Sequence, residues 1–186
     1  SNICVCLAEP LPELSVTKGG QIILSGGSLA VGSAEIGESV SSAITLNSVG
    51  LLPLTGITAS LSGTDASLFS VTTPPPSLYP TATADITIQF NPEAIGSKTA
   101  TLSITSNDAA SPYTISLSAI GVSPEVQIEQ PVGNSLVDGV STVDFGTVTT
   151  GSATKTFRIT NVGNTTLRLI EATITGSNSD DYTLTT

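Results

Sequence analysis

The sequence of 186 residues contains no histidine, tryptophan or methionine, and it has 5 basic against 15 acidic side chains. Without histidine, neither a Ser–His–Asp triad nor a Cys–His pair can form. The basic residues are scattered and the formal net charge is −10 at pH 7, whereas binding to nucleic acid or to anionic lipid needs a basic surface. We therefore expect no nucleic-acid partner and no docking on anionic membranes.

Long hydrophobic runs and metal-ligand clusters are also missing. No apolar run approaches the roughly 18 residues of a membrane helix, so we expect no membrane insertion. Two cysteines without histidine make a poor zinc ligand set. The acidic pairs Glu35/Glu38 and Asp180/Asp181 fall in expected loops, whereas a glycosidase holds two carboxylates across a cleft. We predict a protein that is not an enzyme and binds no metal or cofactor.

An internal repeat with a spacing of about 113 residues is the clearest feature that is present. Three segments return in order: Pro12-Glu13-Leu14 as Pro124-Glu125-Val126, Ser48-Val49-Gly50 as Asn161-Val162-Gly163, and Phe69-Ser70-Val71 as Tyr182-Thr183-Leu184. A repeat of this length is a whole small domain. We divide the chain into an N-terminal extended segment (1–11), a complete domain (12–121), a short linker (122–124) and a partial second domain (125–186).

The fold class predicted for both copies is all-β. Short β-rich runs about ten residues apart, separated by Gly, Pro, Asn and Ser, are typical of an immunoglobulin-like sandwich. In the first domain we expect seven strands, near 13–17, 39–47, 56–62, 68–72, 84–90, 98–105 and 113–119. In the second we expect strands near 125–129, 142–147, 154–161, 167–175 and 182–186, with no counterparts of residues 74–121. Phe90, Phe145 and Phe157 are expected in the core, and Tyr79 on the surface.

Two segments carry a family resemblance. Asp144-Phe145-Gly146 is followed by Gly151 and by Thr160-Asn161-Val162-Gly163, and the first copy contains Phe90-Asn91-Pro92 and Ser106-Asn107-Asp108. Together they resemble the ASH (Hydin-like) immunoglobulin-like domains, including the bacterial choice-of-anchor D repeats. The first copy departs from the pattern with Val31 before Gly32, and with Ser48 in place of asparagine. The resemblance implies a seven-stranded sandwich, a role in surface or structural assemblies, and no shared catalytic residues.

The N-terminal segment is apolar and carries both cysteines. In Ile3-Cys4-Val5-Cys6-Leu7, the cysteines at i and i+2 of a strand point to one face, where a bond between them would be strained. We regard these five residues as candidates for interchain contact or disulfide formation. Buried, reduced thiols remain an equally open interpretation.

Two further sets of residues are candidates for contact or modification. Tyr182 and Leu184 would lie on an open strand edge of the unfinished second domain, and such edges pair with other chains. Asn164, in Asn164-Thr165-Thr166, is a candidate glycosylation site. The low charge content of 11%, with abundant serine and threonine, leads us to expect an extracellular or cell-surface protein.

Three functions remain open. In the first hypothesis, which we favour, the chain is a non-catalytic structural subunit of a surface polymer or filament. It is built by strand complementation with other copies of itself or neighbouring immunoglobulin-like domains. Alternatively, it is a spacer or stalk fragment of a longer secreted or cell-surface protein. A ligand- or carbohydrate-binding accessory module is the third reading, although few aromatic side chains are available for sugar contacts.

Overall fold

The computed structural model describes residues 9–168 and 170–185, and the chain divides into two compact units between Val122 and Ser123. This division falls inside the segment 122–124 that the repeat marks as the linker. Apart from two short 3-10 turns, the regular structure of the described residues consists of strands. The fold is therefore all-β, as the sequence predicts, and each unit is described by itself below.

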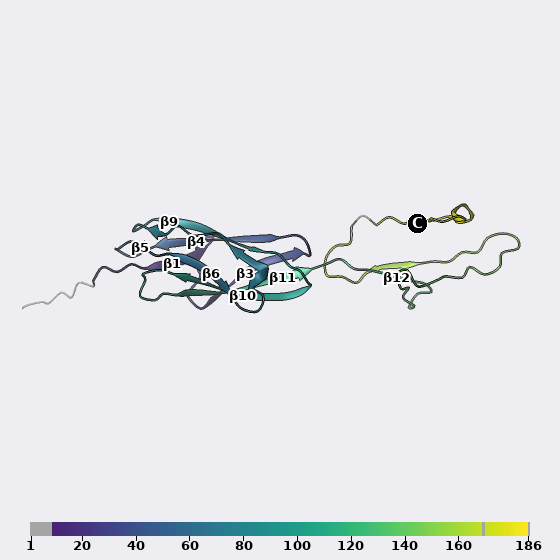
Figure 1. Ribbon diagram of the computed structural model, residues 1–186. Helices are drawn as coiled ribbons and strands as arrows, with labels where there is room; N and C mark the ends of the chain where they lie inside the picture. The colour runs from purple at the N-terminus through teal and green to yellow at the C-terminus, as the bar shows by residue number, and fades with distance from the viewer. Residues whose placement is uncertain (1–8, 169, 186) are drawn as a thin grey trace, which may run out of the picture. The chain divides into compact units, whose positions relative to one another are not determined.

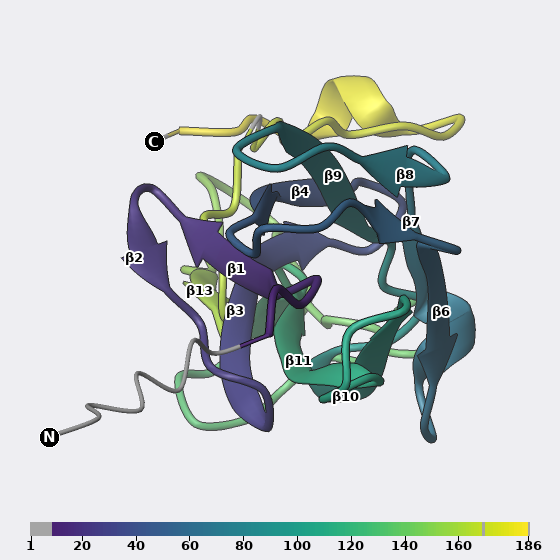
Figure 2. The ribbon, with the colours of Figure 1, turned by 90° about the vertical axis from the view of Figure 1, so that its left-hand side faces the viewer.

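The first unit is a sandwich of two sheets, whose layers are visible in Figures 1 and 2. One sheet has the strand order β2-β1-β4-β9-β7 and the other β3-β11-β10-β6. Their bounds are β1 Leu14–Lys18, β2 Gln21–Ile22, β3 Gly27–Glu35, β4 Val40–Ser48, β6 Thr58–Ser62, β7 Phe69–Val71, β9 Thr83–Phe90, β10 Gly96–Thr105 and β11 Tyr113–Val122. A short pair, β5 (Leu54–Thr55) with β8 (Ser77–Leu78), and the 3-10 turn η1 (Ala66–Leu68) complete the unit.

The core of the first unit follows from strand alternation. Successive side chains of a strand point to opposite faces. In β9, Ile86, Ile88 and Phe90 are fully buried between the sheets, while the residues between them lie on the outer face. The Phe90 ring packs against Phe69 of the neighbouring strand β7, with 4.9 Å between the ring centroids. The central strand β9 thus supplies much of the core and bridges β4 to β7.

All seven strands predicted for the first unit are present, with ends that differ by a few residues. The prediction missed β3 because this strand is rich in small residues and pairs in parallel with β11, which lies far along the chain. Gly32 sits where that pairing shifts register, at φ +138°, and a Cβ there would lie 2.9 Å from a methyl group of Val40. Local sequence alternation does not report a long-range pairing of this kind.

The second unit reproduces part of the first in matching register. Its strands β12 (Val126–Glu129) and β13 (Arg158–Asn161) pair antiparallel, with Val126 opposite Asn161 and Ile128 opposite Ile159. This is the register of β1 on β4, where Leu14 lies opposite Ser48 and Val16 opposite Leu46. The 3-10 turn η2 (Ser179–Asp181) repeats η1, with backbone angles at its ends that agree to within about 15° by direct comparison.

A close backbone contact after the paired strands is also repeated. Gly50 approaches the chain so tightly that a Cβ would lie 2.3 Å from the carbonyl oxygen of Leu11, and at Gly163 the equivalent distance to Ser123 O is 2.4 Å. The N–H of Val49 donates to Glu13 O at 3.0 Å, and the N–H of Val162 donates to Glu125 O at 2.8 Å. Only glycine fits such a contact, which explains why Gly50 is repeated as Gly163.

Three strands predicted for the second unit are wrong: no strand occurs among the described residues of 142–147, 167–175 and 182–186, and 154–161 is extended only over β13. The reason lies in the pairing scheme of the first unit. There β3 pairs only with β11, β6 only with β10, and β7 only with β9, and the 186-residue sequence holds no second copy of β9–β11. Strands form in the second unit where both members of a pair are repeated.

Candidate functional site

The second unit exposes the face that corresponds to the core of the first. In the first unit Ile44 is 1% and Leu46 0% exposed, whereas their counterparts Phe157 and Ile159 on and beside β13 are 41% and 45% exposed. Further pairs behave in the same way: Leu14 and Val126, Val16 and Ile128, Ile57 and Ile170, Phe69 and Tyr182. The expectation that Phe157 lies in a core is therefore wrong, because the strands that would cover it are not among the described residues.

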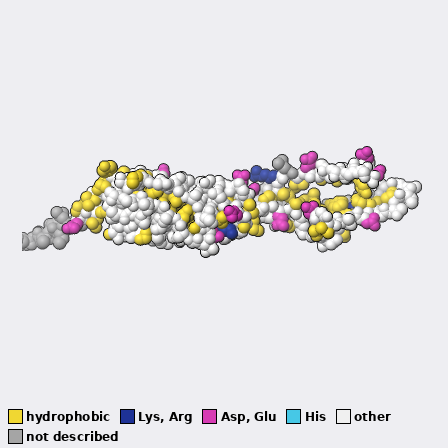
Figure 3. All heavy atoms as spheres, viewed as in Figure 1, with side chains coloured by type: hydrophobic (Ala, Val, Ile, Leu, Met, Phe, Trp, Pro, Cys, Tyr) yellow, Lys and Arg dark blue, Asp and Glu magenta, His cyan; other side chains and the backbone are white. Residues whose placement is uncertain are grey.

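We call this set (Val126, Ile128, Phe157, Ile159, Ile170 and Tyr182) the uncovered face. Figure 3 shows hydrophobic side chains at the surface of the second unit. Phe145 is half-buried and makes an edge-on contact with the Tyr182 ring, with centroids 5.5 Å apart. Tyr182 is the counterpart of Phe69, whose ring meets Phe90 of β9 in the first unit. Scattered apolar residues are normal on surfaces, but a concentrated set marks an interaction site.

The positions beside β13 show which strand would cover this face. In the first unit β9 lies between β4 and β7, with Thr45 opposite Asp85 and Phe69 opposite Phe90. In the second unit β13 stands for β4, and residues 182–184 stand for β7. The edge of β13 that corresponds to the β9-facing edge of β4 has no strand partner among the described residues. An unpaired edge beside an apolar face can accept an added strand.

The candidate residues from the sequence lie in three places. Ile3, Cys4, Val5, Cys6 and Leu7 fall outside the described residues. Tyr182 and Leu184 are 49% and 50% exposed and lie outside any strand, immediately after η2. Asn164 is exposed, and its Oδ1 accepts a hydrogen bond of 2.8 Å from the N–H of Ser123. Its role as a glycosylation site remains a prediction.

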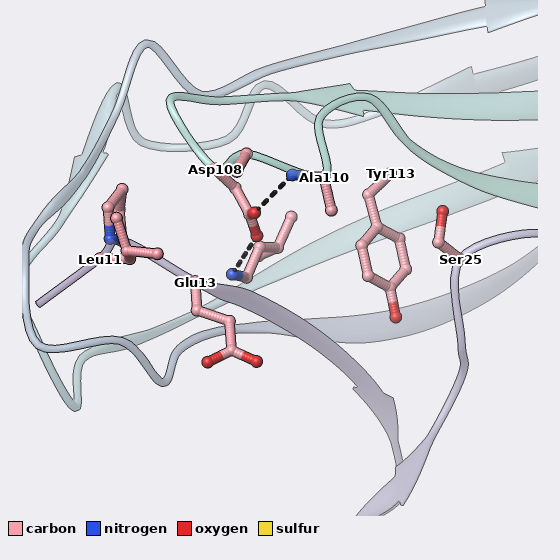
Figure 4. Close-up of a pocket in the computed structure, with 9 residues that line it drawn as sticks. Leu11, Glu13, Ser25, Asp108, Ala110 and Tyr113 are labelled. Atoms are coloured by element: carbon pink, nitrogen blue, oxygen red, sulfur yellow. Dashed lines mark hydrogen bonds between the residues drawn. The ribbon is translucent and has the colours of Figure 1, made fainter. Parts of the chain in front are cut away.

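A pocket of about 300 Å³ at one end of the first unit offers no reactive arrangement. It is lined by residues of the β1 start, the turn before β3 and the β10–β11 turn, including Asp108 and Tyr113 (Figure 4). The Asp108 carboxylate accepts hydrogen bonds from the N–H groups of Leu14 (2.7 Å) and Ala110 (2.8 Å). The Glu13 carboxylate points away from it (Figure 4). Asp108 is thus engaged in holding the chain rather than poised as an acid or base.

The same turn explains the Ser-Asn-Asp motif in structural terms. Asn107 Oδ1 accepts from the N–H of Thr55 at 2.9 Å, and its Nδ2 donates to Pro53 O at 3.2 Å. Asn107 and Asp108 therefore fasten the β10–β11 turn to β5 and β1. The motif is visible in the sequence, but this role is not, because the hydrogen-bond partners are 52 and 94 residues away along the chain.

Tyr113 is one of the residues that line the pocket. Its hydroxyl donates to the carbonyl oxygen of Ile23. Burial raises the pKa of this phenol, and a backbone hydrogen bond with Val16 partly offsets the rise. The hydroxyl is therefore neutral at physiological pH and acts as a structural donor.

Three other kinds of site come into question: a metal site, a membrane-spanning helix and a ligand hollow beside Tyr79. Within residues 9–168 and 170–185, no three His, Cys, Asp or Glu side chains gather closely enough to hold a metal ion. No helix in the same part of the chain has the length and apolarity to cross a bilayer. Tyr79 is 74% exposed, as expected, and borders a hollow of about 220 Å³ with Thr55 and Ser77. One aromatic ring and two hydroxyls make a minimal ligand site, so the uncovered face is the strongest candidate.

Comparison with known proteins gives one family match. A family model described as the HYDIN/CFA65/VesB-like Ig-like domain matches residues 20–120, from β2 almost to the end of β11. No curated protein matches the sequence.

Several solved structures are similar to parts of the chain, and three of them follow. A protein of unknown function from Porphyromonas gingivalis W83 is 20% identical, with a TM-score of 0.48 over 62% of this chain and 50% of that one. The chain thus spans half the length of that protein. The ASH/PapD-like domain 7 of human CEP192 is 17% identical, with a TM-score of 0.44 over 67% of this chain and 96% of that domain. A family 123 glycoside hydrolase from Clostridium perfringens is 14% identical, with a TM-score of 0.46 over 60% of this chain and 27% of the hydrolase.

Proposed function

Because the chain belongs to the HYDIN/CFA65/VesB-like Ig-like domain family, we propose that it is an extracellular structural protein that assembles by strand complementation. In this proposal a neighbouring chain supplies strands that cover the second unit, and the first unit acts as a completed, rigid module. A family of immunoglobulin-like domains suggests a non-catalytic structural role, and the hydrogen-bonded Asp108 in the pocket of the first unit agrees with it.

The uncovered face is the single observation that carries the proposal. Its residues stand at positions that the first unit buries, and Ile159 lies on β13, whose counterpart β4 pairs with β9 in the first unit. Fully burying a large apolar side chain stabilises by about 1.5–3 kcal/mol. Covering several such residues at once, together with a new row of main-chain hydrogen bonds, provides a strong drive for association.

The N-terminal segment is a candidate donor. Ile3, Val5 and Leu7 alternate as Ile86, Ile88 and Phe90 do in β9, so they present the same spacing of apolar side chains. A donor that precedes the first unit and an acceptor in the second unit produce a head-to-tail contact between chains. Such a contact extends into a filament when it does not close into a ring. Under oxidising conditions, Cys4 and Cys6 would be available to link neighbouring chains by disulfides.

The competing arrangement is a spacer, in which strands later in a longer surface protein cover the same face. Both arrangements use the uncovered face, but only assembly makes its burial depend on protein concentration. The composition supports a surface location in either case, with 11% charged residues and a net charge of −10.

Sedimentation velocity over a range of protein concentrations tests the proposal. We expect the full chain to form oligomers that Phe157→Asp dissociates, because a charge on the uncovered face opposes its burial. Leu51→Asp is the matched control, since Leu51 is 75% exposed on the first unit and lies outside the uncovered face. Reducing agent should lower the sedimentation coefficient of any oligomers that are linked by disulfides between cysteines of neighbouring chains. A strict monomer at all concentrations would overturn the assembly proposal.

A further inference from the structure

Arg158 occupies a position from which it would meet the covering strand. In the first unit the equivalent residue is Thr45, which lies opposite Asp85 of β9 and donates its hydroxyl to Asp85 Oδ1 at 2.7 Å. The matching registers of β1 on β4 and β12 on β13 place Arg158 at the Thr45 position. A strand that covers the second unit as β9 covers the first would therefore bring its Asp85 equivalent against the Arg158 guanidinium.

The surroundings of Arg158 favour an acidic partner. Its side chain is 57% exposed, and its ion pair with Glu129 on the opposite side is long, at 3.9 Å. Exposed pairs of this kind contribute little. The Glu129 carboxylate also accepts a hydrogen bond of 2.9 Å from the N–H of Gly133. A guanidinium has five donors arranged for carboxylates, so Arg158 can keep Glu129 and bind a second carboxylate on its other side.

We propose that Arg158 selects the strand that completes the second unit, and that the natural occupant is a β9-type strand of a neighbouring immunoglobulin-like repeat on another chain. That strand carries alternating apolar residues toward Phe157 and Ile159, and an acidic residue on its outer face opposite Arg158. The inference rests on the proposed function and narrows it. It also distinguishes between donors, because Asn2 stands in place of Asp85 when Ile3, Val5 and Leu7 take the places of Ile86, Ile88 and Phe90.

The preference for an acidic residue opposite Arg158 follows from the geometry of antiparallel strands. Directly opposed residues have Cβ atoms about 5 Å apart, so opposite charges attract and like charges repel. The apolar contacts are common to any amphipathic strand, whereas the Arg158 contact is specific to an acid at one register position. A shift of the register by one residue would also turn the apolar side chains away from the uncovered face. Apolar alternation and charge together therefore set both the partner and its alignment.

Binding of labelled peptides to the full chain, measured by fluorescence anisotropy at a concentration where the chain is monomeric, tests the inference. The first peptide has the sequence of residues 80–92, the second is the same peptide with Asp85→Lys, and the third has the sequence of residues 1–11 with both cysteines replaced by serine. The proteins are the unmodified chain, Arg158→Glu, and the control Arg168→Glu, which makes the same charge change outside β13.

We expect the unmodified chain and Arg168→Glu to bind the first peptide at least about fivefold more tightly than its Asp85→Lys form. Arg158→Glu should reverse this preference. An equal preference in all three proteins would overturn the inference. If only the peptide of residues 1–11 binds, strand complementation survives and selection by Arg158 fails. If no peptide binds and the chain is monomeric in sedimentation, the proposed function fails as well.

Discussion

Leu46 and Ile159 stand at equivalent positions of the repeat but in opposite environments. Truncating each to alanine therefore tests whether the second unit buries this position as the first unit does. Both substitutions remove three carbon atoms. Leu46 is 0% exposed between the two sheets of the first unit, and Ile159 is 45% exposed on β13. If the second unit were a closed domain like the first, the two substitutions would have similar effects.

The expected magnitudes differ widely. Leu46→Ala leaves a cavity in a packed core, so we expect it to lower the free energy of unfolding of the first unit by about 2–5 kcal/mol. Ile159→Ala removes a side chain that is half in solvent, so the monomer should change by less than about 0.5 kcal/mol. In the assembly that we propose, the donated strand covers Ile159. There we expect Ile159→Ala to weaken association strongly, as truncation of a buried interface residue does.

Urea denaturation followed by far-UV circular dichroism measures the first effect. With a slope of about 1–3 kcal/mol per molar urea, Leu46→Ala should lower the midpoint by about 1 M or more, while Ile159→Ala leaves it unchanged. Sedimentation of the same proteins measures the second effect. A large loss of stability in monomeric Ile159→Ala would refute the reasoning, because it would show that Ile159 is already buried.

Three further predictions concern the first unit. Gly50→Ala places a Cβ 2.3 Å from the carbonyl oxygen of Leu11, so we expect about 1–3 kcal/mol of destabilisation in urea titration; an unchanged midpoint would speak against that contact. Asp108→Ala removes the acceptor for the N–H groups of Leu14 and Ala110, so we expect it to lower the free energy of unfolding by about 1–3 kcal/mol. A variant as stable as the wild type would contradict this role of Asp108. Burial raises the pKa of Tyr113, so its stabilising effect is complete below about pH 10 and is lost as pH rises through the folded-state pKa; melting temperatures should therefore fall at alkaline pH in the wild type but less in Tyr113→Phe.

Local patterns in the sequence predict the first unit well. The alternation in 84–90, 98–105 and 113–119 is strong because each strand presents one face to the core, and the structure places strands there. The fold class and the family resemblance are confirmed by the sandwich and by the family match to residues 20–120. The missed strand β3 depends on parallel pairing with β11, and no local pattern reports such a partner.

In the second unit, local sequence patterns do not predict where strands form. Residues 142–147 and 167–175 have β-like composition, yet they form no strands in the described part of the chain. A strand needs a neighbour for its N–H and C=O groups, and the 186 residues of the sequence contain no second copy of the strands that pair with the counterparts of these segments in the first unit. The sequence predicts only an open edge at Tyr182 and Leu184. The roles of Phe157, Ile159 and Arg158 follow from their counterparts Ile44, Leu46 and Thr45, whose surroundings only the structure shows.

Hydrogen–deuterium exchange of the full chain, compared between dilute monomer and concentrated protein, tests most directly whether the uncovered face accepts strands. The decisive amides lie on the open edge of β13 and in 182–184, the counterparts of β4 and β7, between which β9 lies in the first unit. They should exchange rapidly in the monomer, where they lack strand partners, and become protected on assembly. Protected amides in the dilute monomer, or assembly without any gain of protection in these segments, would contradict strand complementation at this face.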